Sequence, residues 1–187
     1  MKKILFSAMM IAGVILVSNN NAAAQDTNSD NHTIGIAIPE VALLDLEASA
    51  GKNITMNFTA PTEAGLPITG ANDNNTIWLN YSSIKSITDA TRKVSVSIDA
   101  AVAGVTIKVT AAADAGSGAG TKGTASAQLT LTTTAQDIIS GIGSAYTGTG
   151  VNKGHQLTYN LTAEDANYAN LSASTNTVTV TYTISDN

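Results

Sequence analysis

Apolar residues alternate with polar or small residues along most of the chain after residue 32. Successive side chains of a β-strand point to opposite faces, so this alternation predicts strands that bury one face and leave the other in water. The expected strands are residues 33–38, 40–47, 53–59, 76–82, 93–99, 105–109, 125–132, 155–161 and 177–184.

The separating segments contain Gly, Pro, Asn and Asp, and no long stretch has the 3.6-residue period of an amphipathic helix. About nine short strands joined by turns predict an all-β fold, an immunoglobulin-like antiparallel β-sandwich, over residues 33–187. Residues 134–142 are ambiguous, because Ile138, Ile139 and Ile142 also fit a short helical turn. Residues 111–123 are low in complexity and are expected to form a loop.

The alternation also predicts which side chains form the core. In residues 76–82 the buried face is expected to carry Ile77, Leu79 and Tyr81, with Trp78 on the opposite face. In the first long apolar segment the expected buried residues are Val41, Leu43 and Leu46, and in the last strand they are Val178, Val180, Tyr182 and Ile184.

The first 24 residues have the pattern of a secretory signal peptide. Lys2 and Lys3 precede an apolar run over residues 4–17, and Ala22-Ala23-Ala24 supplies the small residues before a cleavage site. We expect cleavage after Ala24, which leaves 163 residues, and no later run approaches the roughly 20 apolar residues that span a bilayer. The mature protein is therefore expected to be exported to the cell surface or the medium, without direct membrane insertion.

The segment that follows is polar and then abruptly apolar. Residues 25–32 have no apolar period and are expected to form a flexible leader. In residues 33–38, Ile34, Ile36 and Ile38 leave one face of an extended chain, and Pro39 ends the run because it has no amide hydrogen for a sheet. This strand either pairs within its own domain or inserts into a neighbouring copy, and the pattern fits both.

The composition narrows the class of protein. The chain has no cysteine, which excludes disulfides, thiolate metal sites and lipoprotein anchoring. Without Lys2 and Lys3, seven basic residues remain against 14 acidic ones, a net charge of −7. Nucleic acid and anionic membranes are recognised by basic surfaces, so neither is an expected partner.

Residues that could carry chemistry are few. His32 lies in the leader, His155 lies just before a strand, and neither has a metal-ligand spacing. Asp45 and Glu47 share one face of a strand, as a glycosidase pair could, but surface carboxylates are usually just solvated. We therefore predict no enzyme activity, no catalytic residue, no metal and no cofactor. A secreted hydrolase is the last of the alternatives.

Two aromatic side chains are candidates for a sugar-binding platform. Tyr81 shares its face with Ile77 and Leu79, so it is expected to lie in the core. Trp78 points the other way and is the possible glycan-binding residue, although a single tryptophan in a sandwich more often packs.

Three stretches together resemble the alpha-type chaperone–usher fimbrial subunits, the pilins of colonization-factor fimbriae. They occur in the family's order and span most of the mature chain. They are Ile34-Gly35-Ile36-Ala37-Ile38-Pro39 followed by Val41, Leu43, Leu44, Asp45 and Leu46; Thr88-Asp89-Ala90-Thr91-Arg92-Lys93-Val94 and on to Ile98; and Ala145 to Asn152 followed by Gln156-Leu157 and Asn167-Tyr168.

The resemblance implies a structural, non-enzymatic subunit of an adhesive surface filament. A subunit of this family lacks one strand of its sandwich, which a periplasmic chaperone fills before the N-terminal strand of the next subunit replaces it at an outer-membrane usher. By this resemblance Ile34, Ile36 and Ile38 are the donor-strand residues and neighbouring copies of the chain are the partners. The alternative is a self-contained secreted sandwich that binds a glycan or a host protein.

Overall fold

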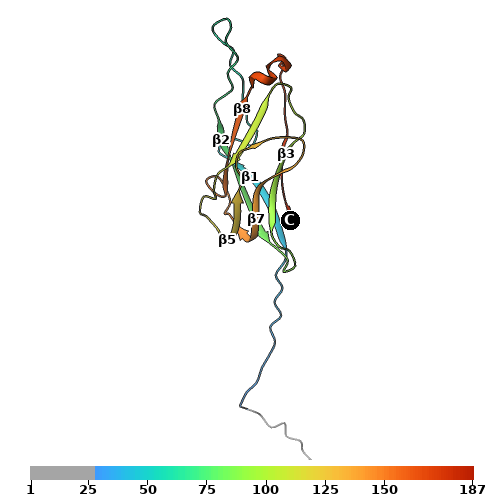
Figure 1. Ribbon diagram of the computed structural model, residues 1–187. Helices are drawn as coiled ribbons and strands as arrows, with labels where there is room; N and C mark the ends of the chain where they lie inside the picture. The colour runs from blue at the N-terminus through green and yellow to red at the C-terminus, as the bar shows by residue number, and fades with distance from the viewer. Residues whose placement is uncertain (1–27) are drawn as a thin grey trace, which may run out of the picture. The chain divides into compact units, whose positions relative to one another are not determined.

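The computed structural model describes residues 28–187, so the predicted signal peptide, residues 1–24, lies outside the described residues. The chain divides into one unit that ends at Ala37 and a larger unit, Ile38–Asn187. The larger unit contains all the strands of the described residues (Figure 1).

Nine strands and one short 3₁₀-helix make up this larger unit. They are β1 (Val41–Ala48), β2 (Asn74–Ile84), β3 (Arg92–Ile98), β4 (Thr106–Ala111), β5 (Ala119–Ala125), β6 (Leu129–Thr130), β7 (Gln136–Tyr146), β8 (His155–Thr162), η1 (Asp165–Asn170) and β9 (Val180–Asp186).

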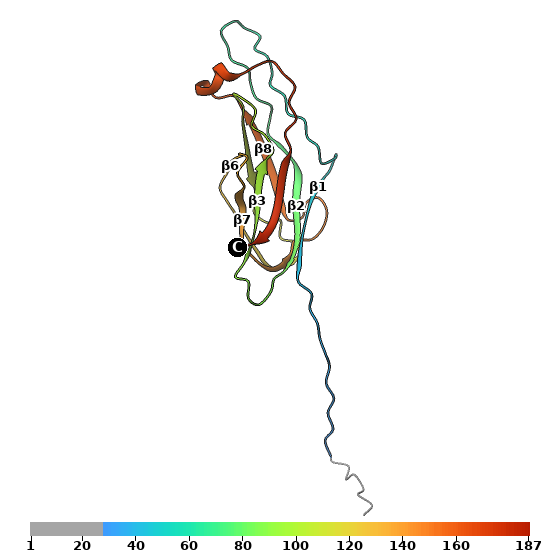
Figure 2. The ribbon, with the colours of Figure 1, turned by 90° about the vertical axis from the view of Figure 1, so that its right-hand side faces the viewer.

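All the strand pairs are antiparallel and they form two groups. One group pairs β1 with β2, β2 with β8, β8 with β4 and β4 with β6. The other pairs β5 with β7, β7 with β3 and β3 with β9. The groups join where Ser82 and Ser83 of β2 lie opposite Tyr146 and Ala145 of β7. The fold is therefore the predicted all-β, sandwich-like one (Figures 1 and 2).

Both groups contribute to a single core. Its fully buried side chains include Leu79 from β2, Leu157 from β8, Val94 from β3 and Ile139 from β7. The hydroxyls of Tyr159 and Tyr182 meet at 2.8 Å, so a buried hydrogen bond joins β8 to β9. The predicted burial of Ile77, Leu79 and Tyr81 is confirmed.

The predicted core residues of β1 are confirmed for Leu46 and wrong for Leu43. Leu44, Leu46 and Ala48 lie opposite Tyr81, Leu79 and Ile77 of β2 and pack on the core, whereas Leu43 is 66% exposed. The run Leu43-Leu44 permits either phase, and the register with β2 decides between them.

One predicted strand is a loop in the structure, and one predicted loop contains a strand. Residues 53–59 were predicted as a strand but contain only a bridge from Thr59 to Thr69, although Ile54 and Met56 still pack on the core. Within the predicted loop 111–123, β5 begins at Ala119 because Gly120, at φ +88°, lets the backbone pass close to Ser144 of β7. The predicted strand 125–132 contains only β6 as a new strand.

The ambiguous segment 134–142 is part of β7 and not a helical turn. The pairing of β7 with β3 shifts register between Arg92 and Val94 and again between Val94 and Ser95. These β-bulges turn Ile138, Ile139 and Ile142 all toward the core, which explains a spacing that resembles a helix.

Candidate functional site

The segment before β1 carries three exposed isoleucines. Residues 29–40 form no strand, and Ile34, Ile36 and Ile38 are 75%, 82% and 75% exposed. Isolated exposed apolar residues are ordinary, but three at a spacing of two form a continuous apolar edge on an extended chain.

The strands β1 and β9 each have one free edge. Among the described strands β1 pairs only with β2, β9 pairs only with β3, and the two lie near each other without a ladder between them. We call these two edges and the half-buried apolar side chains beside them the β1–β9 seam. Those side chains, which also pack on the core, are Leu44, Leu46, Ala48, Val180 and Ile184.

The apolar strip continues past the ends of both strands. Ile54 and Met56 follow β1, Val178 precedes β9, and all three pack on the core while remaining partly exposed. At the seam, apolar side chains of the core are therefore only partly covered, and β1 and β9 each have one edge without a neighbouring strand among the described residues.

A buried arginine closes the seam at one end, which we call the base of the domain. Arg92, at the start of β3, is 2% exposed. Its Nε donates to Asp186 at the end of β9 at 2.7 Å, its Nη2 donates to Glu40, and its Nη1 donates to the carbonyl oxygens of Val41 and Ile84. One side chain thus ties the beginning of β1 to the end of β9.

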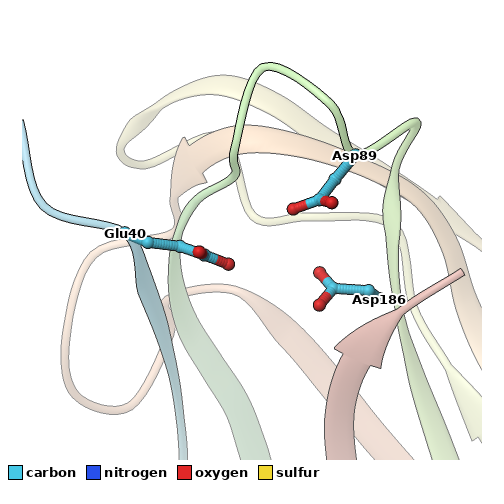
Figure 3. Close-up of side chains that lie close together, drawn as sticks. All are labelled: Glu40, Asp89 and Asp186. Carbon is cyan, nitrogen blue, oxygen red and sulfur yellow. The ribbon is translucent and has the colours of Figure 1, made fainter.

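Three carboxylates lie close together at the base of the domain. Figure 3 shows them on Glu40, Asp89 and Asp186. Their oxygens lie within 4.8 Å of one another, a separation that could suit a metal ion. Glu40 and Asp186 are already ion-paired with Arg92, whose guanidinium supplies the positive charge at this place. The arrangement therefore acts as a clamp between strands.

Trp78 lies on the face of β2 that points away from the core, as predicted, and is half-buried. It stands between Glu47 of β1 and Gln156 of β8 in the strand register. Nearby on this face, Asn80 is buried and donates to the carbonyl oxygen of Gly150 at 2.9 Å. The loop that contains Gly150 therefore covers part of the face.

Asp45 of β1, one of the two carboxylates considered as a glycosidase pair, forms an ion pair at the surface. Asp45 is exposed and ion-paired with Lys52 at 2.6 Å, and the hydrogen bond from Lys52 lowers the pKa of Asp45. An ionised, paired carboxylate on an open surface lacks the enclosed geometry that a glycosidase acid needs.

His155 is buried and hydrogen-bonded. Its Nδ1 lies 2.8 Å from the carbonyl oxygen of Ala112, its Nε2 lies 3.1 Å from the Tyr81 hydroxyl, and the two rings stack at 5.8 Å. Burial lowers the pKa of His155 and raises that of Tyr81. Sequence reasoning did not find this contact, although His155 is in phase with Leu157 and Tyr159, the core residues of β8.

No family model, curated protein or solved structure matches this chain. Within residues 28–187 there is also no helix with the length and apolar character needed to cross a membrane.

Proposed function

We propose that this chain is a non-enzymatic structural subunit of an adhesive bacterial surface filament, assembled by exchange of N-terminal strands between copies. The observation that carries the proposal is the exposed isoleucine edge of residues 34–38 in a protein whose β1–β9 seam has two free strand edges. In β-strand addition, main-chain hydrogen bonds supply affinity and alternate side chains enter the core to set the register.

The spacing of the two surfaces supports this pairing. Ile34, Ile36 and Ile38 repeat every two residues, which is about 6.6 Å along a strand. The inward residues of β9, Val180, Tyr182 and Ile184, have the same repeat. An inserted segment would cover the half-buried residues of the seam and satisfy the free edges of β1 and β9.

The topology also gives the inserted strand a direction. The clamp at Arg92 fixes the beginning of β1 and the end of β9 at the base, so the donor segment leaves each copy there. In an open filament this segment enters the next copy from the opposite end of its seam, because entry at the base would make two copies exchange strands and close as a dimer. The donor therefore runs antiparallel to β9 and parallel to β1.

This mode of assembly implies two further partners. A subunit with an uncovered seam needs protection in the periplasm, which a chaperone strand provides, and an outer-membrane usher would be the site of exchange. Export and the surface location are part of the same proposal.

Substitution of the three isoleucines tests the proposal. We expect Ile34→Ser, Ile36→Ser and Ile38→Ser together, or deletion of residues 33–38, to abolish polymers and leave soluble subunits. The measurement is electrophoresis of a sheared surface fraction in SDS, with and without boiling, in which strand-exchanged polymers give a ladder that boiling collapses to monomer.

The same segment provides a matched control. Gly35→Ser and Ala37→Ser change the opposite face of the extended chain and are expected to leave the ladder intact. A boiling-sensitive ladder that survives deletion of residues 33–38 would contradict the proposal.

Trp78 supports a second candidate function, glycan binding by a self-contained domain. Its half-buried ring on the outer face of β2, beside Glu47 and Gln156, leaves part of an aromatic surface for a sugar. Under this alternative Trp78→Ala lowers binding on a glycan array, whereas wild-type protein that binds no glycan on the array excludes the alternative.

A further inference from the structure

The two ends of the domain each carry a shallow hollow with a mixed polar and apolar lining. Figures 1 and 2 place the loop between β2 and β3 at the base, and the long loop between β1 and β2 together with η1 at the other end, which we call the tip. The strand β2 connects the two ends, and its 11 residues span about 35 Å.

The hollow at the base lies beside the point where the N-terminal segment leaves the domain. It measures about 500 Å³ and is lined by Ile38, Pro39, Ile84 and Ile87 together with Glu40 and Lys85. The hollow at the tip is of similar size, about 510 Å³, and its lining residues are Gly65, Leu66, Pro67, Asp165 and Tyr168.

Ile87 is held outward at the base by its own loop. Its side chain is 98% exposed, the highest fraction among the large exposed apolar residues. The backbone amide of Ser86 donates to the Asp89 carboxylate at 3.2 Å, and the amide of Asp89 donates back to the carbonyl oxygen of Ser86 at 3.2 Å. Lys85 Nζ donates to the carbonyl oxygen of Asp89 at 2.5 Å, so this turn is braced and presents Ile87 as a fixed apolar projection.

The tip is braced in a similar way. The hydroxyl of Tyr168 in η1 accepts a hydrogen bond from the backbone amide of Ile68 at 3.1 Å, which joins η1 to the loop between β1 and β2. Leu66 remains 58% exposed beside this junction. A preformed apolar surface at each end reduces the entropy lost when the two surfaces meet.

We propose that Ile87 of one copy docks in the tip hollow of the next copy, against Leu66 and Tyr168, as a second contact between successive subunits. The inference rests on the proposed function, since insertion of residues 34–38 at the tip end of a neighbour brings the base of the donor copy toward that tip. Only Pro39 separates Ile38 from Glu40, which the Arg92 clamp holds at the base.

The contact joins different surfaces of identical chains, so it repeats along an open filament and has no twofold symmetry.

The absence of cysteine from the chain allows a direct test by disulfide trapping. We expect the full-length double variant Ile87→Cys with Leu66→Cys, after oxidation of assembled polymers, to give a ladder that survives boiling and collapses with reductant. Each single variant should give no such ladder. The matched control is Leu43→Cys with Leu66→Cys, because Leu43 is also strongly exposed but lies on β1 and lines neither hollow.

Unboiled, reduced samples separate the failure of this contact from the failure of the filament proposal. A boiling-sensitive ladder without the disulfide ladder overturns the docking contact and leaves strand exchange standing. The absence of both ladders overturns both. Disulfide dimers of the Ile87→Cys single variant would show two bases facing each other, which also overturns the head-to-tail contact.

Discussion

Two stretches of this chain have the same alternation and opposite environments. Ile77, Leu79 and Tyr81 are 2%, 0% and 3% exposed in the centre of the fold, whereas Ile34, Ile36 and Ile38 are 75%, 82% and 75% exposed. The first stretch lies in β2, between β1 and β8, and the second lies in no strand. Alternation therefore specifies an extended chain with one apolar face, while a partner strand decides whether that face is buried.

The largest expected effect compares one residue from each stretch. Leu79→Ala should destabilise the monomeric protein by about 2–5 kcal/mol, because it removes a fully buried side chain from a packed core. Ile36→Ala should change the free energy of unfolding by less than about 0.5 kcal/mol, as expected for an exposed position. Urea unfolding of the monomer measures both, and equal losses would show that the isoleucine stretch is buried in its own domain.

The next effect concerns Arg92 of β3. Its guanidinium binds Glu40 and Val41, where the exposed stretch is followed by β1. Arg92→Met should cost about 1–3 kcal/mol, mainly because the carbonyl oxygens of Val41 and Ile84 lose their donor. Its ion pairs add little, since Glu40 and Asp186 are about half exposed.

The neighbouring Lys93→Met is the control for this effect. Lys93 is partly exposed and its ion pair with Asp137 measures 3.0 Å, so we expect a change within about 1 kcal/mol. Thermal unfolding of both variants gives the comparison. Equal midpoints for Arg92→Met and the wild type would show that the clamp does not hold the base.

The smallest effect is a dependence of stability on pH. It comes from His155, which stacks on Tyr81 of the buried stretch. Burial lowers the pKa of His155, which stacks on Tyr81, so the unfolded chain binds a proton more readily than the folded one. Stability from this group is complete above pH 6.5, the ordinary pKa of histidine, and falls below it by at most about 1.4 kcal/mol per pH unit. Urea unfolding between pH 5.5 and 7.5 measures this slope.

His155→Gln should flatten the slope, and His32→Gln, at an exposed position, should leave it unchanged. A slope that persists in His155→Gln would place the titrating group elsewhere.

The sequence predicts the sandwich class and the inward faces of β2, β3 and β8 because their alternation is regular and each has partners on both sides. It does not predict β5, since a glycine-rich strand carries no apolar pattern and is stabilised by close approach to β7. It also fails to decide between a strand and a helical turn for β7, where bulges break the period of two. Both failures arise from backbone geometry that side-chain patterns do not record.

The candidate site also has one part that the sequence predicts and other parts that it does not. The isoleucine stretch is visible in the sequence as a period of two followed by a proline. The seam is not, because Leu44 and Ile184 have the pattern of ordinary core residues and only the strand order leaves their edges free. Arg92 appears in the sequence as one more charged residue before a strand. Its burial depends on carbonyl and carboxylate oxygens 51 and 94 residues away.

The clamp at Arg92 has a consequence for the order in which the chain folds. Its two acidic partners, Glu40 and Asp186, lie at opposite ends of the domain sequence, so the contact cannot form until nearly the whole domain is available to fold. The strands β1 and β9 are also the first and the last strands of the fold in sequence order. A chain that folds as it emerges therefore passes through a period in which its core is open at both ends of the sequence, and formation of the clamp marks the end of that period.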